Sequence, residues 1–197
     1  MFKRLFDLFF SLVGLLCLFP LLLFIAVWIK MGSEGPVFFR QERVGLNGEL
    51  FKIHKFRTMK VNSESTGRLT VGADSRITKE GAFLRKLKLD ELPQLIDVLI
   101  GKMSLVGPRP EVLEFIECYP PDIKTKVLSV RPGITDRASI EMVDENDILS
   151  KYDDAKQAYV DIILPMKQSY YLAYVNDNSL VGDLCIILAT LKKIVTR

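Results

Sequence analysis

The longest feature of the hydrophobic pattern is an uncharged run over residues 8–29, in which only Ser11, Gly14 and Pro20 fall outside the apolar set. As a helix of 22 residues, the run would be about 33 Å long, enough to cross a bilayer once. Pro20 removes one backbone donor near the middle and predicts a kink. Basic residues flank both ends, which favours the cytoplasm for both. The pattern therefore leaves open a spanning helix or a re-entrant hairpin with arms one leaflet deep.

The pattern then changes to short alternating segments, which are typical of strands. Residues 36–43 and 49–57 are β-like, because apolar and polar positions alternate in them. Asn47-Gly48 between the two segments is the strongest short-range signal for a hairpin. Polar, Gly-rich or Pro-rich stretches predict loops over residues 61–74, 106–111 and 130–134.

Helical periodicity dominates the rest of the chain and predicts helices over residues 81–88, 90–100, 154–175 and 179–195. In the second of these, Asp90 is the expected N-cap and Pro93 lies in the first turn. In the last, every third or fourth residue from Leu180 to Val195 is apolar, which favours a core helix first and a membrane-surface helix second. The expected fold is α+β, mostly helical, with a small β-hairpin.

Composition narrows the class of protein. The 197 residues are 49% hydrophobic and 26% charged, which excludes disorder, and a single apolar run excludes a multi-span transporter. Residues 31–110 carry 14 basic and 9 acidic residues, so this part either binds an anionic partner or presents a solvated surface. Three cysteines without a C-x-x-C pair and a single histidine, His54, argue against a zinc site.

Two adjacent carboxylates carry the candidate chemistry. Asp90 and Glu91 follow Arg85 and precede Arg109, which stands between two prolines. A rigidly held guanidinium can grip phosphate, one carboxylate can attack phosphorus, and a second can hold Mg²⁺. The alternatives are carboxylates that only complement a helix dipole and an Arg109 that is a solvated charge on a turn. The sequence contains no phosphate-binding Gly-rich loop, dinucleotide fingerprint or Asp-x-Asp motif.

Eight short blocks follow one another in a characteristic order: residues 3–7, 44–47, 55–59, 72–78, 83–86, 89–95, 103–110 and 131–135. Together they closely resemble the signature blocks of the bacterial sugar transferases, the monotopic phosphoglycosyl transferases. The resemblance covers essentially the whole chain, and the length matches the small single-domain members. It implies a re-entrant membrane helix over residues 1–30, broken at Pro20. A cytoplasmic catalytic domain over residues 31–197 would follow, surrounded by amphipathic interfacial helices.

The resemblance also implies a reaction. Such enzymes move a sugar phosphate from a UDP-sugar to polyprenol (undecaprenyl) phosphate at the cytoplasmic face of the bacterial inner membrane. They release UMP and begin the synthesis of a surface glycoconjugate. By motif, Asp90 would be the nucleophile that forms an aspartyl intermediate. Glu91, the second catalytic residue, would hold Mg²⁺, which Mn²⁺ could replace.

The same resemblance assigns the remaining site residues and partners. Lys55, Arg85 and Arg109 would bind the substrate phosphates, and Arg131, Pro132 and Gly133 would bind the nucleotide. The expected partners are a UDP-sugar, polyprenol phosphate and membrane lipids, without nucleic acid. A homodimer stays open.

Some positions depart from the family pattern. Phe19 precedes Pro20 where serine is common, Asp97 stands where asparagine is frequent, and residues 136–140 differ from many members. The last of these segments leaves the choice of sugar open. Two other classes compete with the transferase: a membrane-anchored binding module that needs no Mg²⁺, and a processive glycosyltransferase that would release UDP instead of UMP.

Overall fold

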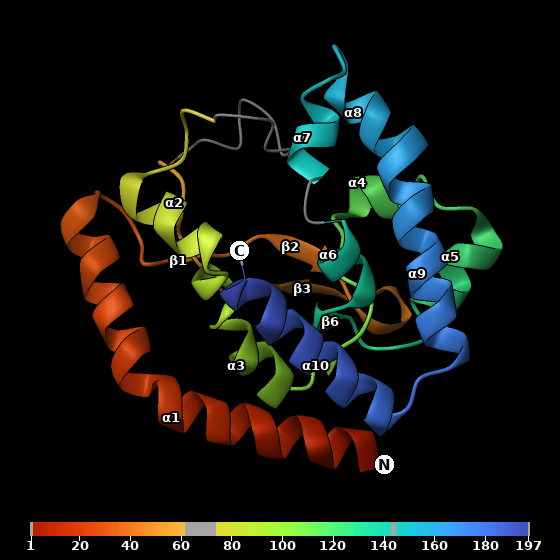
Figure 1. Cartoon of the computed structure of the whole chain (residues 1–197), viewed down its shortest axis with the longest axis horizontal. Coiled ribbons are helices and arrows are strands. Elements are labelled where there is room, and N and C mark those ends of the chain that lie inside the picture. Colours follow the sequence, from red (N-terminus) through yellow and green to blue (C-terminus); the bar gives the residue numbers. More distant parts are fainter. Residues whose placement is uncertain (1, 62–73, 143–144, 197) are drawn as a thin grey trace.

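The computed structural model describes residues 2–61, 74–142 and 145–196, and the structural statements below concern these residues. The described chain is mostly helical with small two-stranded ladders, as predicted (Figure 1). Its α-helices are α1 (Phe2–Gly32), α2 (Lys79–Lys86), α3 (Gln94–Leu99), α4 (Leu113–Ile116), α5 (Pro121–Val127), α6 (Arg137–Glu141), α7 (Glu145–Leu149), α8 (Ala155–Ala158), α9 (Leu164–Asn176) and α10 (Leu180–Val195). Its strands are β1 (Phe38–Phe39), β2 (Glu42–Val44), β3 (Leu50–Lys52), β4 (Lys55–Phe56), β5 (Ser104–Val106) and β6 (Gly133–Thr135).

Helix α1 is long, apolar and bent (Figure 1). Pro20 is the proline inside it, and a proline accounts for a bend because it cannot complete the helical hydrogen-bond ladder. Among the described helices, α1 alone is long and apolar enough to cross a membrane. Most of its large side chains are exposed, and its buried residues are Asp7, Ser11, Ile25 and Ile29. Its apolar surface is therefore largely uncovered by the protein itself.

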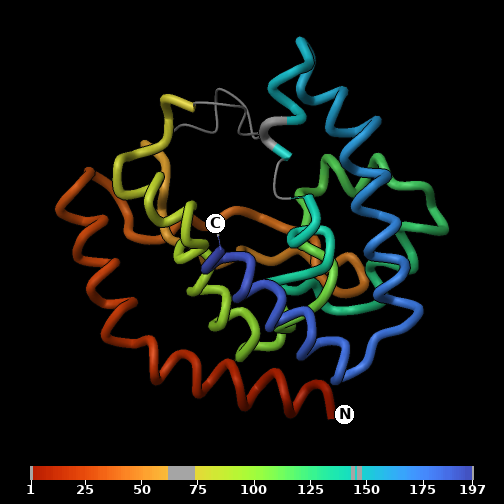
Figure 2. Tube along the Cα trace, viewed as in Figure 1, coloured from red at the N-terminus to blue at the C-terminus, as the bar shows by residue number. Residues whose placement is uncertain are grey.

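Both arms of α1 are nevertheless fixed to the rest of the chain. In the N-terminal arm, the buried carboxylate of Asp7 accepts hydrogen bonds from the Ser104 hydroxyl (2.8 Å) and the Leu105 amide (3.1 Å). In the C-terminal arm, Ile25 and Ile29 form a buried cluster with Phe56 and Leu84. The trace shows the N-terminal arm running along one side of the molecule and the other arm turning up beside α2 (Figure 2). The bent helix therefore packs against the rest of the chain through both of its arms.

The predicted hairpin is confirmed. Strands β2 and β3 pair antiparallel, with Val44 opposite Leu50, while β1 and β4 form a second antiparallel pair outside them. The turn uses the predicted dipeptide: Asn47 and Gly48 have φ of 55° and 83°, the left-handed region that these two residue types tolerate best. The loop predicted over residues 61–74 lies almost entirely outside the described residues, as does the beginning of the block at 72–78.

The helix predicted from residue 90 begins later, so Asp90 is not its N-cap. Residues Leu89–Glu91 form a separate 3₁₀ turn, labelled η3, and α3 starts at Gln94 after Pro93. Pro93 has no N–H to donate to an upstream carbonyl. The chain therefore passes through short turns, in which the Leu92 and Leu95 amides bond to carbonyls three residues earlier. This break frees the Asp90 side chain for other contacts.

A parallel strand pair adjoins the two Pro/Gly segments predicted as loops: residues 107–111 and 130–132 are irregular as predicted, but Val106 ends β5 and residues 133–134 begin β6. Strands β5 and β6 pair in parallel, with Ser104 opposite Gly133 and Val106 opposite Thr135. A side chain at Gly133 would lie 2.1 Å from the Gly107 nitrogen, so only glycine allows this close backbone approach. Pairing between segments this far apart has no local signature in the sequence, which explains why the pattern did not predict these two short strands.

The two C-terminal helices agree with their predicted bounds but not with the predicted packing of the last one. Residues 154–175 form α8, a π-helical turn (Tyr159–Ile163, η4) and α9, and α10 begins after its Ser179 cap. The largest core cluster joins α4, α5, η4 and α9 around Phe115, Tyr159 and Tyr171. The apolar stripe of α10 lies outside this core: Leu188 is 57% exposed. The core interpretation of α10 is therefore wrong.

Candidate active site

Asp90 lies at the centre of the candidate site. It sits in η3 and is buried, with 1% of its surface exposed. Its Oδ2 atom accepts the Lys55 ammonium at 2.9 Å, and Lys55 comes from β4. Its Oδ1 atom is buried and has no hydrogen-bond partner among the described residues. A buried carboxylate oxygen without a partner is costly, which points to a ligand that completes the site.

Glu91 is held by two cations. Arg109 grips it with two hydrogen bonds, Nη2 to Oε1 at 2.6 Å and Nη1 to Oε2 at 3.2 Å, and Lys55 lies 3.2 Å from Oε1. Burial alone would raise the pKa of Glu91, but Arg109 and Lys55 outweigh it and hold the pKa well below its usual value. Glu91 in turn raises the pKa of Arg109. The hypothesis that Arg109 is a solvated charge on a turn is therefore wrong.

The strand pair places Arg109. The Gly107 amide donates to the Thr135 carbonyl, and the Gly133 amide donates to the Pro108 carbonyl at 2.9 Å. The segment 108–110 therefore leaves the end of β5 in a fixed direction, with a proline on each side of the arginine. These backbone contacts orient the Arg109 side chain so that its guanidinium faces η3.

Arg85 approaches the same carboxylates from α2. Its Nε donates to the Thr58 hydroxyl at 2.9 Å. Burial lowers the pKa of Arg85, and the nearby Asp90 carboxylate partly opposes that shift. Gly81 lets α2 lie against the chain at Thr58, because a side chain there would be 2.1 Å from the Thr58 carbonyl oxygen. A close helix contact thus brings a third cation toward Asp90.

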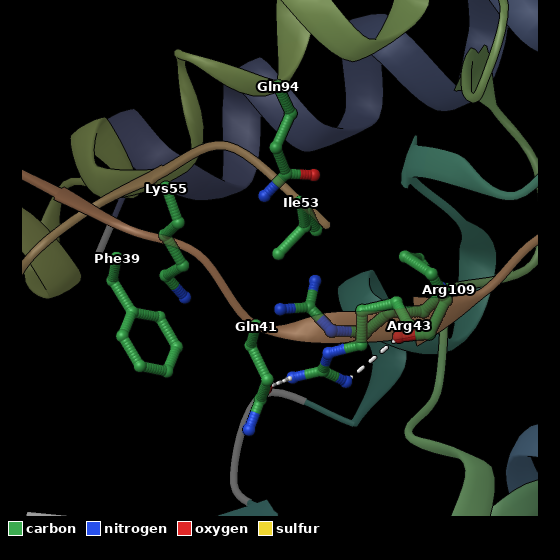
Figure 3. Close-up of a pocket in the computed structure, with 8 residues that line it drawn as sticks. Phe39, Gln41, Arg43, Ile53, Lys55, Gln94 and Arg109 are labelled. Carbon is green, nitrogen blue, oxygen red and sulfur yellow. Dashed lines mark hydrogen bonds between the residues drawn. The ribbon is translucent and has the colours of Figure 1, made fainter. Parts of the chain in front are cut away.

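A small cavity opens beside this cluster, lined by Phe39, Gln41, Arg43, Ile53, Lys55, Gln94, Arg109 and Pro110 (Figure 3). Three of its lining side chains are cationic and two are amides. Arg43 donates to the Gln41 side-chain oxygen at 2.6 Å and to the Pro110 carbonyl at 2.9 Å. The cavity is therefore suited to an anion with several oxygen atoms.

Comparison with known proteins assigns the chain to a family. A family model described as bacterial sugar transferase matches residues 1–197. The chain is a bacterial sugar transferase family member. The resemblance of the sequence blocks is thereby confirmed.

Several curated relatives of this family member are longer than it is. The UDP-glucose:undecaprenyl-phosphate glucose-1-phosphate transferase of Klebsiella pneumoniae is 41% identical over 197 residues, 98% of this chain and 40% of the relative. The UDP-N-acetylgalactosamine-undecaprenyl-phosphate N-acetylgalactosaminephosphotransferase of Aeromonas hydrophila is 36% identical over 197 residues, covering 98% and 44%. The exopolysaccharide production protein PSS of Rhizobium leguminosarum bv. phaseoli is 52% identical over 109 residues, 54% of each chain. The chain thus spans less than half the length of the first two.

The predicted site residues of this bacterial sugar transferase fall into two groups. Lys55, Arg85, Asp90, Glu91 and Arg109 come together, although they belong to four separate segments of the chain. Residues 131–133, predicted to bind the nucleotide, make their contacts elsewhere. The Arg131 Nε donates to the Gly101 carbonyl at 2.9 Å, and the Pro132 carbonyl accepts from the Ser104 amide. This segment supports the strand pair, and its nucleotide role stays a prediction.

Four polar residues near the site were not assigned to it from the sequence: Gln41, Arg43, Lys88 and Gln94. Gln41 and Arg43 are two positions apart, and on a strand such residues share a face. That spacing within the predicted β-segment is the signal that could have found them. Gln94 is buried and lines the cavity from α3. Lys88, whose pKa is lowered by burial, has a left-handed backbone with φ of 57° just before η3.

The predicted metal site can be tested against the donor atoms. Within the described residues, no group of three or more His, Cys, Asp or Glu side chains is arranged for a metal. Mg²⁺ needs fewer, because it binds one or two carboxylates together with water and substrate phosphates. The unpartnered Oδ1 of Asp90 fits this requirement as a hard oxygen donor. Glu91 fits only if the metal replaces one of its cation contacts, so its role as ligand stays a prediction.

Proposed function

We propose that this bacterial sugar transferase moves a sugar 1-phosphate from a UDP-sugar to polyprenyl phosphate through a covalent intermediate on Asp90, and releases UMP. The observation that carries the proposal is the Asp90 carboxylate itself. One of its oxygens is held by Lys55, and the other is buried without a partner among the described residues. The surrounding cations, Arg85 and Arg109 among them, suit a substrate with two phosphates. The names of the Klebsiella pneumoniae and Aeromonas hydrophila relatives support this substrate class.

The reaction would proceed in two displacements at one phosphorus atom. In the first, an Asp90 oxygen attacks the phosphorus that carries the sugar. The bond from that phosphorus to the bridging oxygen breaks, and UMP leaves with the bonding electrons. In the second, an oxygen of polyprenyl phosphate attacks the same phosphorus. The bond to Asp90 breaks, the carboxylate is regenerated, and the polyprenyl diphosphosugar forms.

The charged residues around this phosphorus would each have a different role. Lys55 orients Asp90 through its 2.9 Å contact with Oδ2, and leaves Oδ1 for the attack. Arg109 is held in a fixed direction by its flanking prolines and can stabilise charge on the phosphoryl oxygens. Glu91 would hold Mg²⁺, whose charge offsets that of the phosphates when it is bound.

The contacts of α1 support a monotopic position at the cytoplasmic face of the bacterial inner membrane. Asp7 in the N-terminal arm bonds to Ser104, whereas Ile29 in the other arm packs in the cluster of Phe56 and Leu84. Both arms therefore contact the same folded body, and a helix with its ends on opposite sides of a bilayer could not do this. The basic flanks favour the cytoplasmic side for both ends. UDP-sugars would then reach Asp90 directly.

The test follows the released nucleotide and the intermediate. Purified enzyme in detergent is given a panel of UDP-sugars with Mg²⁺, with and without undecaprenyl phosphate. We expect UMP release and, without the lipid, a mass increase of one phosphosugar on the peptide that contains Asp90. Asp90→Asn should lower turnover by several orders of magnitude, because it removes the attacking oxyanion. The exposed Asp122→Asn is the matched control.

Three outcomes would contradict the proposal. Release of UDP would indicate a glycosyltransferase that breaks the sugar–oxygen bond. An Asp90→Asn variant that keeps more than about a tenth of wild-type turnover would remove the nucleophile from the mechanism. Absence of turnover with every donor, together with binding to anionic lipid that needs no Mg²⁺, would favour a membrane-anchored binding module.

A further inference from the structure

His54 and Asp97 form a hydrogen-bonded pair that the proposed mechanism does not use. The His54 amide donates to Asp97 Oδ2 at 2.8 Å, and His54 Nδ1 lies 2.7 Å from Asp97 Oδ1. Because an ionised carboxylate only accepts hydrogen bonds, the imidazole donates from Nδ1. One carboxylate thus holds both the backbone and the ring of a single residue.

The Asp97 carboxylate is fully buried, with 0% of its side chain exposed. A buried carboxylate is stable only when hydrogen-bond donors replace the water that it has lost. Among the described residues, both donors that reach this carboxylate belong to His54. The departure from the family pattern at position 97 therefore has its partner in the single histidine of the chain.

The pair lies where two strand ladders meet. Strand β3 pairs with β2 and strand β4 pairs with β1, and residues 53–54 form the joint between the two ladders. Asp97 reaches this joint from α3. Gln94 on the same helix and Lys55 just after the joint line one cavity (Figure 3). The pair thus connects the two elements that bring these side chains together.

Lys55 directly follows the joint in the chain. Its ammonium lies 2.9 Å from Asp90 Oδ2 and 3.2 Å from Glu91 Oε1. The direction of its side chain depends on the backbone of His54, which Asp97 holds in place. We propose that Asp97 and His54 are positioning residues for the transfer, which hold the joint between β3 and β4 so that Lys55 reaches the nucleophile. The inference rests on the proposed function.

Replacing the carboxylate of Asp97 by an amide should make this contact depend on pH. An asparagine has one oxygen, which would stay with the His54 amide, while its NH₂ group would face Nδ1. A neutral imidazole accepts from that NH₂ group, but a protonated imidazole donates from both nitrogens and loses the contact. The carboxylate of wild type accepts from both forms.

The surroundings of His54 leave Asp97 as the acceptor on which this argument depends. Among the described residues, Asp97 is the ionised group in contact with the ring. Phe38 of β1 packs edge-on against the ring, with the ring centroids 6.3 Å apart. Lys52 and Lys55 are the charged neighbours in the same segment of the chain.

The kinetic test compares Asp97→Asn with wild type at about pH 8 and about pH 5.5, the range in which imidazole takes up a proton. The matched control is Glu49→Gln, which removes an exposed carboxylate of the same hairpin. At the higher pH, kcat should stay within about 3-fold of wild type. At the lower pH it should fall about 10- to 100-fold below wild type, as for a misplaced catalytic group, with a smaller change in KM. An equal ratio to wild type at both pH values would overturn the proposal.

A double-mutant cycle shows whether the pair acts through Lys55. In a Lys55→Met background at the lower pH, adding Asp97→Asn should lower kcat by less than about 2-fold, because the side chain to be positioned is absent. A purely structural role would not depend on Lys55. An Asp97→Asn effect that is as large without Lys55 as with it would therefore overturn the proposal.

A spectroscopic test separates this inference from the proposed function. His54 is the single histidine of the chain, so ¹⁵N-histidine labelling reports on it alone in protein purified without a histidine tag. Without substrate, Nδ1 should carry a proton in wild type at both pH values, but lose it in Asp97→Asn at about pH 8. A wild-type Nδ1 without a proton would overturn the pair even if UMP is released normally. Failure of wild type to release UMP, with Nδ1 protonated, would contradict the proposed function and the role of the pair in it, but not the contact.

Discussion

Replacing Arg109 by methionine removes one partner of a buried ion pair and leaves the other behind. Glu91 is only 7% exposed and receives two hydrogen bonds from Arg109, at 2.6 and 3.2 Å. Removing one partner of a buried pair costs about 3–5 kcal/mol, because a desolvated charge remains. Lys55 stays 3.2 Å from Glu91 and offsets part of the loss. We therefore expect the lower end, about 3 kcal/mol, or a fall in Tm of about 6–12 °C for a chain of this size.

The assay is thermal and urea unfolding in detergent, followed by far-UV circular dichroism, on a double-mutant cycle. Glu91→Gln removes the buried charge that loses its Arg109 partner in Arg109→Met, so the double variant should regain about 2 kcal/mol relative to Arg109→Met alone. The exposed Arg137→Met is the control for loss of a surface cation. An Arg109→Met variant within about 1 kcal/mol of wild type, or a double variant no more stable than the single, would refute the reasoning.

Three further predictions follow from the same structure. In the folded protein, the pKa of Glu91 is below its usual value. Ionised Glu91 therefore contributes fully to the free energy of unfolding above the unfolded pKa, about 4.3. That contribution is lost as the pH falls toward the folded pKa. In urea unfolding between pH 6 and pH 3, wild type should therefore lose stability more steeply than Glu91→Gln, and parallel curves would contradict the shift. Pro20→Ala should straighten α1 and move its N-terminus across the membrane. A Phe2→Cys probe, in a background without the three native cysteines, should then be labelled by impermeant thiol reagents in intact cells. The same probe with Pro20 intact should react only after lysis. Leu188→Ala should change the free energy of unfolding by less than about 1 kcal/mol, because the side chain is 57% exposed, whereas a loss of about 2–5 kcal/mol would mean that it is packed.

Local features were predictable where a single segment carries its own signal. The apolar run defined α1, and the proline inside it accounts for the bend seen in Figure 1. Asn47-Gly48 located the hairpin because few residues tolerate a positive φ there. Ser179 precedes α10 and caps it through the Gly182 amide, as a serine before a periodic run should.

Features that depend on distant partners were not predictable from one segment. The parallel pairing of β5 with β6 joins segments about 30 positions apart, and only this pairing directs Arg109 toward Glu91. The stripe on α10 was visible, but periodicity identifies an apolar face without saying what covers it. Asp90, Glu91 and Arg109 were candidates from the sequence itself, but the resemblance to the family supplied the specific role of each. Arg43 and Gln94, which line the cavity, needed the folded chain.

The contacts of α1 bear on how the enzyme can be handled in the laboratory. Deleting the apolar helix is the usual way to obtain a soluble form of a membrane-anchored enzyme. Here the helix supplies Ile25 and Ile29 to a cluster with Phe56 and Leu84, and Asp7 binds the strand that leads to Arg109. A chain that starts at residue 33 would expose that cluster and leave the Ser104 hydroxyl and Leu105 amide without their acceptor. Such a truncated chain would aggregate or misplace the site, so purification has to keep the helix and supply detergent for it.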